Sequence, residues 1–337
     1  MIDWLTIELP PVGHDLNNGH VVFVRPNGEI DYMVEKFLTV QGSHDNSVQV
    51  RATGTEVVIS GNPAKWLQGH NLFGISDFRR VLEMYVLSLR HVLKYDDAWY
   101  NDVMSGNFVV KRIDITYNYR LKNQGEVITW LNAVSQVSSG KRQKLTADKG
   151  TTVYFGKGSK RSLVKFYDKE GELTVHPISG KFDTEQTKFL EWYSKGLLRC
   201  EVQLRRKCLE DEFKLTKGID YLKLTEKELR AIYMKKLKGV NIPEKTMIKD
   251  DIIKELPNRL KAVYKFWIEG HDIQEIWPRA TAFRYRKLMR EEYGVDIFLP
   301  CPSTVAKTSR ILPLLRPLEA IPEDVPAGAL EFGLLAA

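Results

Sequence analysis

Alternating apolar and polar residues predict β-strands through most of the first 210 residues. Short runs of this kind lie at Trp4–Leu9, Val21–Val24, Phe37–Val40, Val48–Ala52 and Glu56–Ser60. Longer runs follow at Phe108–Tyr119, Thr151–Phe155, Ser162–Asp168 and Leu197–Arg205. Because successive side chains of a strand point to opposite faces, each run offers one face to a core and the other to solvent or to a site.

Apolar residues at helical spacing predict helices among and after these strands. The helices expected among the strands cover residues 77–93, 126–138 and 185–193. From about residue 207 the pattern is helical, and it predicts helices at Thr225–Lys236, Lys249–Trp267 and Ala280–Tyr293. Two further stretches predict loops, the glycine-punctuated Pro63–Gly74 and the basic Arg142–Gly150.

This order of elements predicts an α+β fold class, with an antiparallel-sheet domain and flanking helices over residues 1–210. A smaller all-helical domain is expected at 211–299. The proline-rich residues 300–337 are expected to form a flexible tail. Within the helical part, Val263–Ile273 and Thr281–Lys287 predict either a helix-turn-helix or an ordinary helical hairpin.

The composition is that of a globular protein with a basic surplus. Hydrophobic residues make up 43%, and 50 Lys and Arg exceed 43 acids, for a net charge of +7. Such a balance suits a polyanionic partner, although many basic proteins bind no nucleic acid. The three cysteines show no metal-binding spacing and indicate a reducing compartment. No signal peptide or bilayer-spanning apolar run is evident, so we expect a soluble intracellular protein.

Three strand segments each place reactive residues on one face. The residues that share the polar face are Arg112, Asp114 and Thr116 in the first segment, Lys165, Tyr167 and Lys169 in the second, and Arg199, Glu201, Gln203 and Arg205 in the third. If the three strands are neighbours, two carboxylates, a tyrosine and several cations converge on one surface. Those are the groups that a metal-assisted phosphodiester transesterase needs.

Tyrosine is a poor nucleophile while protonated, because its ordinary pKa is near 10. Lys165 and Lys169 on either side of Tyr167 would favour the phenolate, which can attack a DNA phosphate. Such an attack leaves a phosphotyrosine linkage and a free 3′ hydroxyl. An isolated tyrosine in a strand more often serves packing, and only the neighbouring motifs favour the catalytic interpretation.

Acids within strands predict a site for Mg²⁺ or Mn²⁺, since both ions prefer oxygen ligands. Asp114 and Glu201 are the candidates, with His70 as a third ligand, a base or a plain loop residue, and Asp3 as a further acid. The alternative is that each acid pairs with a nearby arginine. Residues 156–161 lack the pattern of a Walker loop and predict a basic hairpin tip near DNA, with Lys160 and Arg161.

Several of these motifs together resemble the replication initiators of filamentous bacteriophages, the gene II protein family. The residues that carry the resemblance are Met1-Ile2-Asp3, the Pro63–Gly74 segment (above all the Leu67–Gly74 loop), Arg112-Ile113-Asp114-x-Thr116, Thr152-Val153 through Tyr167-x-Lys169, and Gly196-Leu197-x-Arg199-x-Glu201. Phe166-Tyr167-Asp168-Lys169 and Arg199-x-Glu201 are also similar to plasmid rolling-circle initiators of the Rep_trans type. The resemblance covers about residues 1–210, with a looser likeness at 283–297.

The resemblance implies that Tyr167 nicks the origin, remains linked to the 5′ end and leaves a 3′ hydroxyl that primes rolling-circle synthesis. It implies Asp114 and Glu201 as metal ligands. The expected partners are the double-stranded origin and single-stranded phage DNA, together with a host helicase and polymerase in the bacterial cytoplasm. The DNA contacts that we predict are Arg112, Arg199, Lys160, Arg161, Arg284 and Arg286, with Lys287 beside them.

Two features stay open. The chain lacks the His-hydrophobe-His motif common among rolling-circle initiators, which leaves the full ligand set undefined. A second nucleophile is not singled out among Tyr117, Tyr119 and Tyr154. The rival functions are a DNA-binding replication regulator without catalysis, and a nuclease in which water attacks in place of Tyr167.

Overall fold

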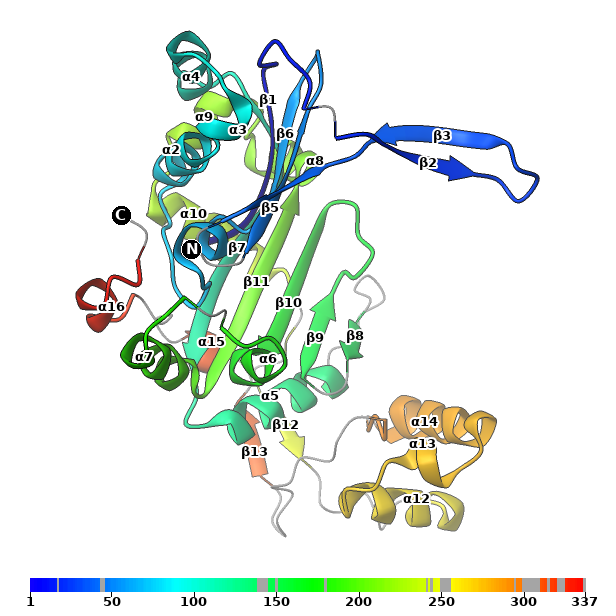
Figure 1. Ribbon diagram of the computed structural model, residues 1–337. Coiled ribbons are helices and arrows are strands. Elements are labelled where there is room, and N and C mark those ends of the chain that lie inside the picture. Colours follow the sequence, from blue (N-terminus) through cyan, green and yellow to red (C-terminus); the bar gives the residue numbers. More distant parts are fainter. Residues whose placement is uncertain are drawn as a thin grey trace.

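The computed structural model describes residues 1–16, 18–42, 46–137, 145–148, 151–178, 181–240, 242, 245–248, 256–293, 295–298, 310–313, 316–319 and 325–335. Within these ranges, one antiparallel sheet holds nine strands in the order β4-β5-β6-β1-β7-β11-β10-β9-β8 (Figure 1). Their bounds are β1 Ile2–Leu9, β4 Leu38–Gln41, β5 Ser47–Ala52, β6 Val57–Gly61, β7 Val109–Arg120, β8 Leu145–Asp148, β9 Thr152–Phe155, β10 Ser162–Asp168 and β11 Leu197–Arg205. The predicted fold class is therefore confirmed.

Helices surround this sheet along the chain. Those up to residue 238 are α1 Pro63–Gln68, α2 Phe78–Ser88, α3 Arg90–Leu93, α4 Asp97–Met104, α5 Gln124–Val137, α6 Lys169–Val175, α7 Thr184–Ser194, α8 Arg206–Phe213, α9 Gly218–Leu222 and α10 Glu226–Lys238. The later ones are α12 Asn258–Ile268, α13 Ile273–Ile276, α14 Arg279–Tyr293, α15 Arg316–Glu319 and α16 Gly328–Glu331. A small pair of strands, β12 Lys245–Ile248 and β13 Arg310–Pro313, joins distant parts of the chain.

The apolar face of the central strands packs against helices α5 and α10. The Phe166 ring of β10 lies 5.1 Å from Trp130 of α5. The Tyr119 hydroxyl of β7 lies 3.0 Å from that of Tyr233 on α10. All four side chains are almost completely buried. Removal of a buried aromatic of this kind costs about 3–5 kcal/mol, so this layer holds the sheet rigid beneath its polar face.

The loop predicted at residues 63–74 begins as a helix. The Asn62 side chain accepts from the backbone N–H of Lys65, and Pro63 occupies the first turn, where its missing N–H is harmless. Gly69 ends α1 at φ +84°, which suits a residue without Cβ. The pattern was too short to show a helical period, so these capping residues were the available signal.

Other predicted elements need correction. The long helix expected at residues 77–93 breaks at Leu89 into α2 and α3. The basic loop expected at 142–150 contains β8, and its other residues lie outside the described ranges. Elements that the pattern did not predict include β3, α4, α6, α8 and α9.

The main core extends beyond the boundary predicted at residue 210. Apolar residues of α8, α9 and α10, such as Leu209 and Tyr233, belong to the same cluster as the sheet. A separate cluster holds α12, α13 and α14 together, with Leu260 and Trp267 at its centre. The short helix α13 lies between the two segments for which a helix-turn-helix or a helical hairpin was predicted.

Part of the predicted flexible tail is packed. Ala329 and Leu334 are buried in a cluster with Leu72 and Tyr193, and α16 lies beside α7 (Figure 1). The prediction therefore fails for residues 325–335. Residues 300–309 of the predicted tail lie outside the described ranges.

A two-stranded arm projects away from the sheet (Figure 1). It consists of β2 His20–Val24 and β3 Ile30–Glu35. Phe23 and Tyr32 stack across it with ring centroids 4.2 Å apart, yet they remain 41% and 51% exposed. The arm thus contributes little to the core. No helix among the described residues is long and apolar enough to cross a membrane.

Candidate active site

The register of three central strands brings the predicted segments together, as the sequence argument required. Strand β11 lies between β7 and β10. Glu201 is paired with Thr116 on one side and Lys165 on the other, and Arg199 is paired with Tyr167. Their polar side chains share one face because the period is two. Burial increases along this face, from Arg112 with 30% of its side chain exposed to Arg199 with none.

Tyr167, Glu201 and Lys165 are in direct contact on this polar face, where Tyr167 is buried and Lys165 is partly exposed. The Tyr167 hydroxyl donates to Glu201 Oε1 at 2.6 Å. Lys165 Nζ donates to Glu201 Oε2 at 3.3 Å and lies 4.0 Å from the centre of the Tyr167 ring. One carboxylate therefore holds the phenol and the ammonium together.

The environment of Tyr167 keeps its phenol protonated. Burial raises the pKa of Tyr167 well above its usual range. Arg199 opposes this shift, while the nearby carboxylates of Glu201 and Asp3 add to it. The phenol is thus a hydrogen-bond donor in this state, and it reacts as a nucleophile only when its proton leaves during attack.

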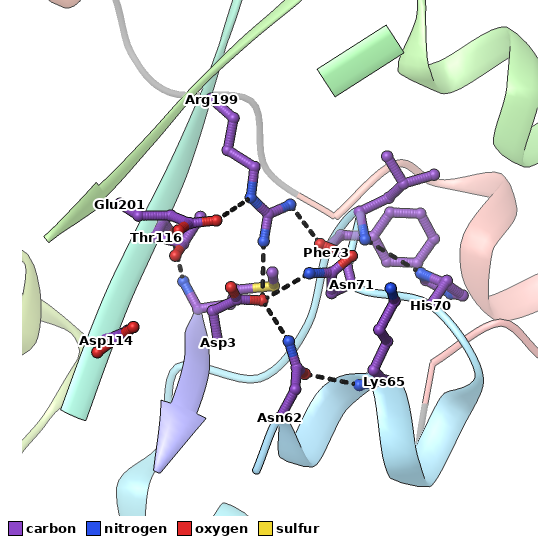
Figure 2. A network of polar contacts seen from close by, with 12 residues as sticks. Asp3, Asn62, Lys65, His70, Asn71, Phe73, Asp114, Thr116, Arg199 and Glu201 are labelled. Atoms are coloured by element: carbon purple, nitrogen blue, oxygen red, sulfur yellow. Dashed lines mark hydrogen bonds and ion pairs between the residues drawn. The ribbon is translucent and has the colours of Figure 1, made fainter. Parts of the chain in front are cut away.

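Arg199 is a buried cation that lies between Glu201, Asp3 and Asn71 (Figure 2). Its guanidinium donates to Asp3 Oδ1 at 2.9 Å and to the backbone carbonyl of Asn71, and its Nε lies 3.5 Å from Glu201 Oε1. Burial lowers its pKa, but Tyr167, Asp3 and Glu201 outweigh that effect and raise the pKa above its usual value. Because it is completely buried, the predicted role of Arg199 in DNA contact is not supported.

Asp3, Asn62 and Asn71 complete the network (Figure 2). The sequence pointed to Asp3 as a further acid but not to the two asparagines. Asp3 Oδ1 accepts from Asn62 at 2.8 Å and from Asn71 at 2.9 Å, in addition to Arg199. Burial tends to raise the Asp3 pKa, but Arg199, Asn71, Lys169 and Asn62 together lower it. The available signal was an aspartate within a strand, where that residue is disfavoured.

Lys169 does not flank the Tyr167 ring as predicted. It is the first residue of α6, and its Nζ donates to Glu172 Oε2 at 2.5 Å and to Asn71 Oδ1 at 3.0 Å. Burial and the nearby Arg199 lower the pKa of Lys169 to about 8, against the pull of Glu172. Of the two predicted lysines, only Lys165 contacts the tyrosine ring.

Asp114 forms the ion pair that was the alternative to metal binding. Arg112 donates to it through both Nε at 2.8 Å and Nη2 at 2.5 Å, and the Arg112 guanidinium lies 5.0 Å from the ring centre of Trp4. Burial raises the pKa of Asp114 to about 6, opposed by Arg112 and assisted by Glu201 and Asp3. A bidentate arginine occupies the oxygens that a cation would need.

His70 is buried and uses both ring nitrogens within the protein. Its Nδ1 accepts from the backbone N–H of Leu72 at 3.3 Å, so Nε2 carries the proton and donates to the carbonyl of Leu334 at 2.8 Å. His70 therefore does not fit the predicted third metal position. Within the described ranges, no group of three or more His, Cys, Asp or Glu side chains is placed to hold a metal ion.

The predicted DNA contacts differ in their exposure. Lys160 at the β9–β10 tip and Arg284 on α14 are exposed. Arg161 instead pairs with Asp211 and Glu212, at 2.7 and 3.3 Å. Arg286 forms a bidentate pair with Asp296. Lys160 and Arg284, together with the exposed Lys287, are thus the better placed for phosphate.

The three tyrosines that could serve as a second nucleophile lie on different faces of the sheet. Tyr117 and Tyr119 lie on the apolar face, against Tyr233. Tyr154 is paired with Lys165 on the polar face, with Lys157 Nζ 4.7 Å from its ring centre.

Comparison with known proteins identifies relatives over most of the chain. Residues 1–225 match the family of the phage replication-associated protein, the gene II protein, in its N-terminal part. The replication-associated protein of Enterobacteria phage I2-2 is 32% identical over 342 residues, which covers 97% of this chain and 96% of the relative. The replication-associated protein of Salmonella phage IKe is 29% identical over 171 residues, covering 46% and 40%.

A solved structure shows a weaker likeness. The rolling circle replication initiator protein from Geobacillus stearothermophilus covers 70% of this chain and 83% of its own, with 14% identity and a TM-score of 0.32.

Proposed function

The chain belongs to the gene II replication-associated protein family of phages, and from that premise we propose that it initiates rolling-circle replication of a phage or related plasmid genome by nicking the origin. The reaction proposed is transesterification of one DNA strand at Tyr167. The contact of the Tyr167 hydroxyl with Glu201 at 2.6 Å carries this proposal, because it pairs a nucleophile with a proton acceptor.

In the proposed step, the Tyr167 oxygen attacks the scissile phosphorus while its proton passes to Glu201. The bond from phosphorus to the 3′ oxygen breaks, and that oxygen takes a proton from water. The hydroxide that remains takes the proton from Glu201, which restores the carboxylate. The products are a 5′ phosphotyrosine and a free 3′ hydroxyl. The number of phosphodiester bonds is unchanged, so the same linkage can later be used to rejoin the strand.

The cations around the pair have separate roles in this proposal. Lys165, with 27% of its side chain exposed, is placed to meet the phosphate. Arg199 is completely buried, and its Nε lies 3.5 Å from Glu201. Its fixed positive charge favours the anionic form of Tyr167 as the phenol loses its proton. Both act through charge that is present before the substrate binds.

Dependence on Mg²⁺ or Mn²⁺ remains a prediction from the family resemblance. His70 does not fit a ligand role. Asp114 is paired with Arg112, and Glu201 accepts hydrogen bonds from Tyr167 and Lys165. The steps above therefore involve groups of the chain alone. Nicking measured over a Mg²⁺ titration, with EDTA as the zero point, tests the dependence directly.

We propose that the substrate is the double-stranded origin, and that single-stranded phage DNA is cut when the displaced strand is recircularised. Exposed Lys160, Arg284 and Lys287 would contact phosphates. A host helicase and polymerase would extend the 3′ end in the bacterial cytoplasm. The salt dependence of origin binding, compared between the wild type and Arg284→Ala, tests the phosphate contact.

The central test uses supercoiled plasmid that carries the origin of the source replicon and is labelled internally with radioactive phosphate. Wild-type protein is expected to retain label after denaturation, at a peptide containing Tyr167. Tyr167→Phe should bind the origin with near wild-type affinity and form no adduct. Tyr154→Phe is the matched control, since it removes a hydroxyl from the same face and should still form the adduct.

Each rival function predicts a different result in this assay. A hydrolytic nuclease nicks without an adduct, and nicking survives Tyr167→Phe. A regulator without catalysis binds the origin and leaves it supercoiled. An adduct that persists in Tyr167→Phe and disappears in Tyr154→Phe would transfer the nucleophile to β9.

A further inference from the structure

We propose that Asn71 is a positioning residue of the nicking site, which sets the places of Arg199, Lys169 and Asp3 and through them the rate of strand transfer. This inference rests on the proposed function. It gives a role to the loop after α1, in which His70 is used for hydrogen bonds to Leu72 and Leu334. Asn71 reaches Tyr167 and Glu201 through these neighbours, so its effect is indirect.

Three polar groups of Asn71 have charged partners, and Figure 2 shows two of these partners, Arg199 and Asp3. Its backbone carbonyl accepts from Arg199, and its side-chain Oδ1 accepts from Lys169 Nζ at 3.0 Å. Its side-chain Nδ2 donates to Asp3 Oδ1 at 2.9 Å. One small residue therefore fixes two buried cations and one buried anion relative to each other.

The position of Arg199 matters because it lies between Asn71 and the reacting pair. Its Nη1 is held by Asn71 and its Nη2 by Asp3, which leaves Nε directed at Glu201, 3.5 Å from Oε1. A planar guanidinium held at two corners has a fixed third side. A shift of the Asn71 carbonyl thus moves the charge that faces the proton acceptor of Tyr167.

The loop that carries Asn71 is fixed from several directions. Gln68 Nε2 donates to the carbonyl of Phe73 at 2.6 Å, and Asn118 Nδ2 donates to that of Leu72 at 2.6 Å. His70 joins the loop to Leu334 in the packed segment 325–335. These bonds leave Asn71 little freedom, which is what positioning requires.

Asn71→Asp is the informative substitution, and Asn62→Asp is its matched control. Both variants replace an amide that donates to Asp3 Oδ1 by a carboxylate, so both disturb Asp3 alike. Asn71→Asp also turns the amide oxygen that accepts from Lys169 into a carboxylate oxygen, which changes the charge beside that buried cation, whereas Asn62→Asp leaves the Lys169 contact as it is. An aspartate at position 62 can still cap α1, because aspartate is a good N-cap residue.

The experiment measures nicking of origin plasmid under single-turnover conditions, over a range of protein concentration. Asn71→Asp is expected to lower the maximal rate by about 10- to 100-fold with little change in the half-saturating concentration, as for a displaced catalytic group. Asn62→Asp, which disturbs Asp3 but not Lys169, should lower the maximal rate at least about 3-fold less than Asn71→Asp does. The double variant Asp3→Asn with Asn71→Asp keeps one carboxylate in the network, and it should regain part of the lost rate.

Thermal melts accompany each variant, so that loss of fold is recognised. Equal maximal rates for Asn71→Asp and wild type would overturn the proposal, as would equal losses in Asn71→Asp and Asn62→Asp. If Asn71→Asp does not fold, Asn71→Ser is used, and its rate must still fall by about 10-fold or more. A wild-type protein that nicks without an adduct refutes Tyr167 as nucleophile, while the comparison of Asn71 with Asn62 still decides the positioning role.

Discussion

The buried ion pair between Arg199 and Asp3 yields a quantitative prediction for folding. Arg199→Met removes the guanidinium and leaves the Asp3 carboxylate, with 9% of its side chain exposed, without its ion pair and hydrogen-bonded by the amides of Asn62 and Asn71. Breaking a buried pair in this way costs about 3–5 kcal/mol of unfolding free energy. At a urea dependence of roughly 2–3 kcal/mol per molar, the midpoint should fall by about 1–2.5 M.

A double-mutant cycle separates the pair from its surroundings. Asp3→Asn with Arg199→Met leaves no unpaired charge, so its loss should be smaller than the sum of the two single losses by about 2 kcal/mol. The exposed pair Arg25 and Asp31, at 2.6 Å with side chains 57% and 42% exposed, is the control. Its coupling should be less than about 1 kcal/mol.

Urea unfolding followed by far-UV circular dichroism provides the measurement. Single losses at Arg199 and Asp3 that add to the double loss within about 0.5 kcal/mol would refute the argument that the two charges neutralise each other. If the coupling energy between Arg25 and Asp31 were as large as that between Arg199 and Asp3, burial could not be the cause of the strong coupling in the buried pair.

Three further predictions follow from the same structure. Because its pKa is lowered to about 8, the buried Lys169 loses its proton near pH 8 in the folded state, whereas the unfolded chain keeps this proton up to about pH 10.5. The free energy of unfolding should therefore rise between pH 8 and 10.5, by at most about 3 kcal/mol, and this rise should be absent in Lys169→Met. Replacing Phe23 and Tyr32 in the exposed arm by serine should change the unfolding free energy by less than about 1 kcal/mol, whereas Phe166→Ala should lower it by about 3–5 kcal/mol; equal effects in thermal melts would mean that the arm is part of the core. Gly196 has φ +66°, and a Cβ there would lie 2.7 Å from the carbonyl oxygen of Leu121, so Gly196→Ala should lower the midpoint of urea unfolding by more than the exposed Gly158→Ala, which meets no atom within 4 Å.

Much of the sheet could be predicted because its signals are local. The segment at Leu197–Arg205 alternates cleanly, and its bounds in the structure are those predicted. The same alternation placed Tyr167, Lys165, Glu201 and Asp114 on one face, since that inference needs only a period of two. The neighbouring order of the three strands was a condition of the argument, and the register meets it.

The failures concern the partner that each side chain finds across the fold. Asp114 and Arg112 are two residues apart on one strand, so their pairing was visible as an alternative. The bond from His70 to Leu334 spans 264 residues, and no pattern near His70 signals it. Lys169 was misplaced because strand alternation ends at Asp168, the residue before α6. Sequence periodicity defines faces, whereas burial and long-range contacts decide which charges meet.

The same long-range contacts set the order of events during synthesis. Strand β1 lies between β6 and β7, and Asp3 pairs with Arg199 across 196 positions of the chain. Contacts this distant in sequence slow folding, because loop closure precedes any gain from pairing. At about 5–20 residues per second, the ribosome needs roughly 10–40 s to travel from Asp3 to Arg199. Until then β7 lacks its neighbour β11, and the growing chain holds Asp3 without its cation. The polar face of Tyr167, Arg199 and Glu201 is therefore complete only after residue 201 has been synthesised, and a half-made chain lacks it.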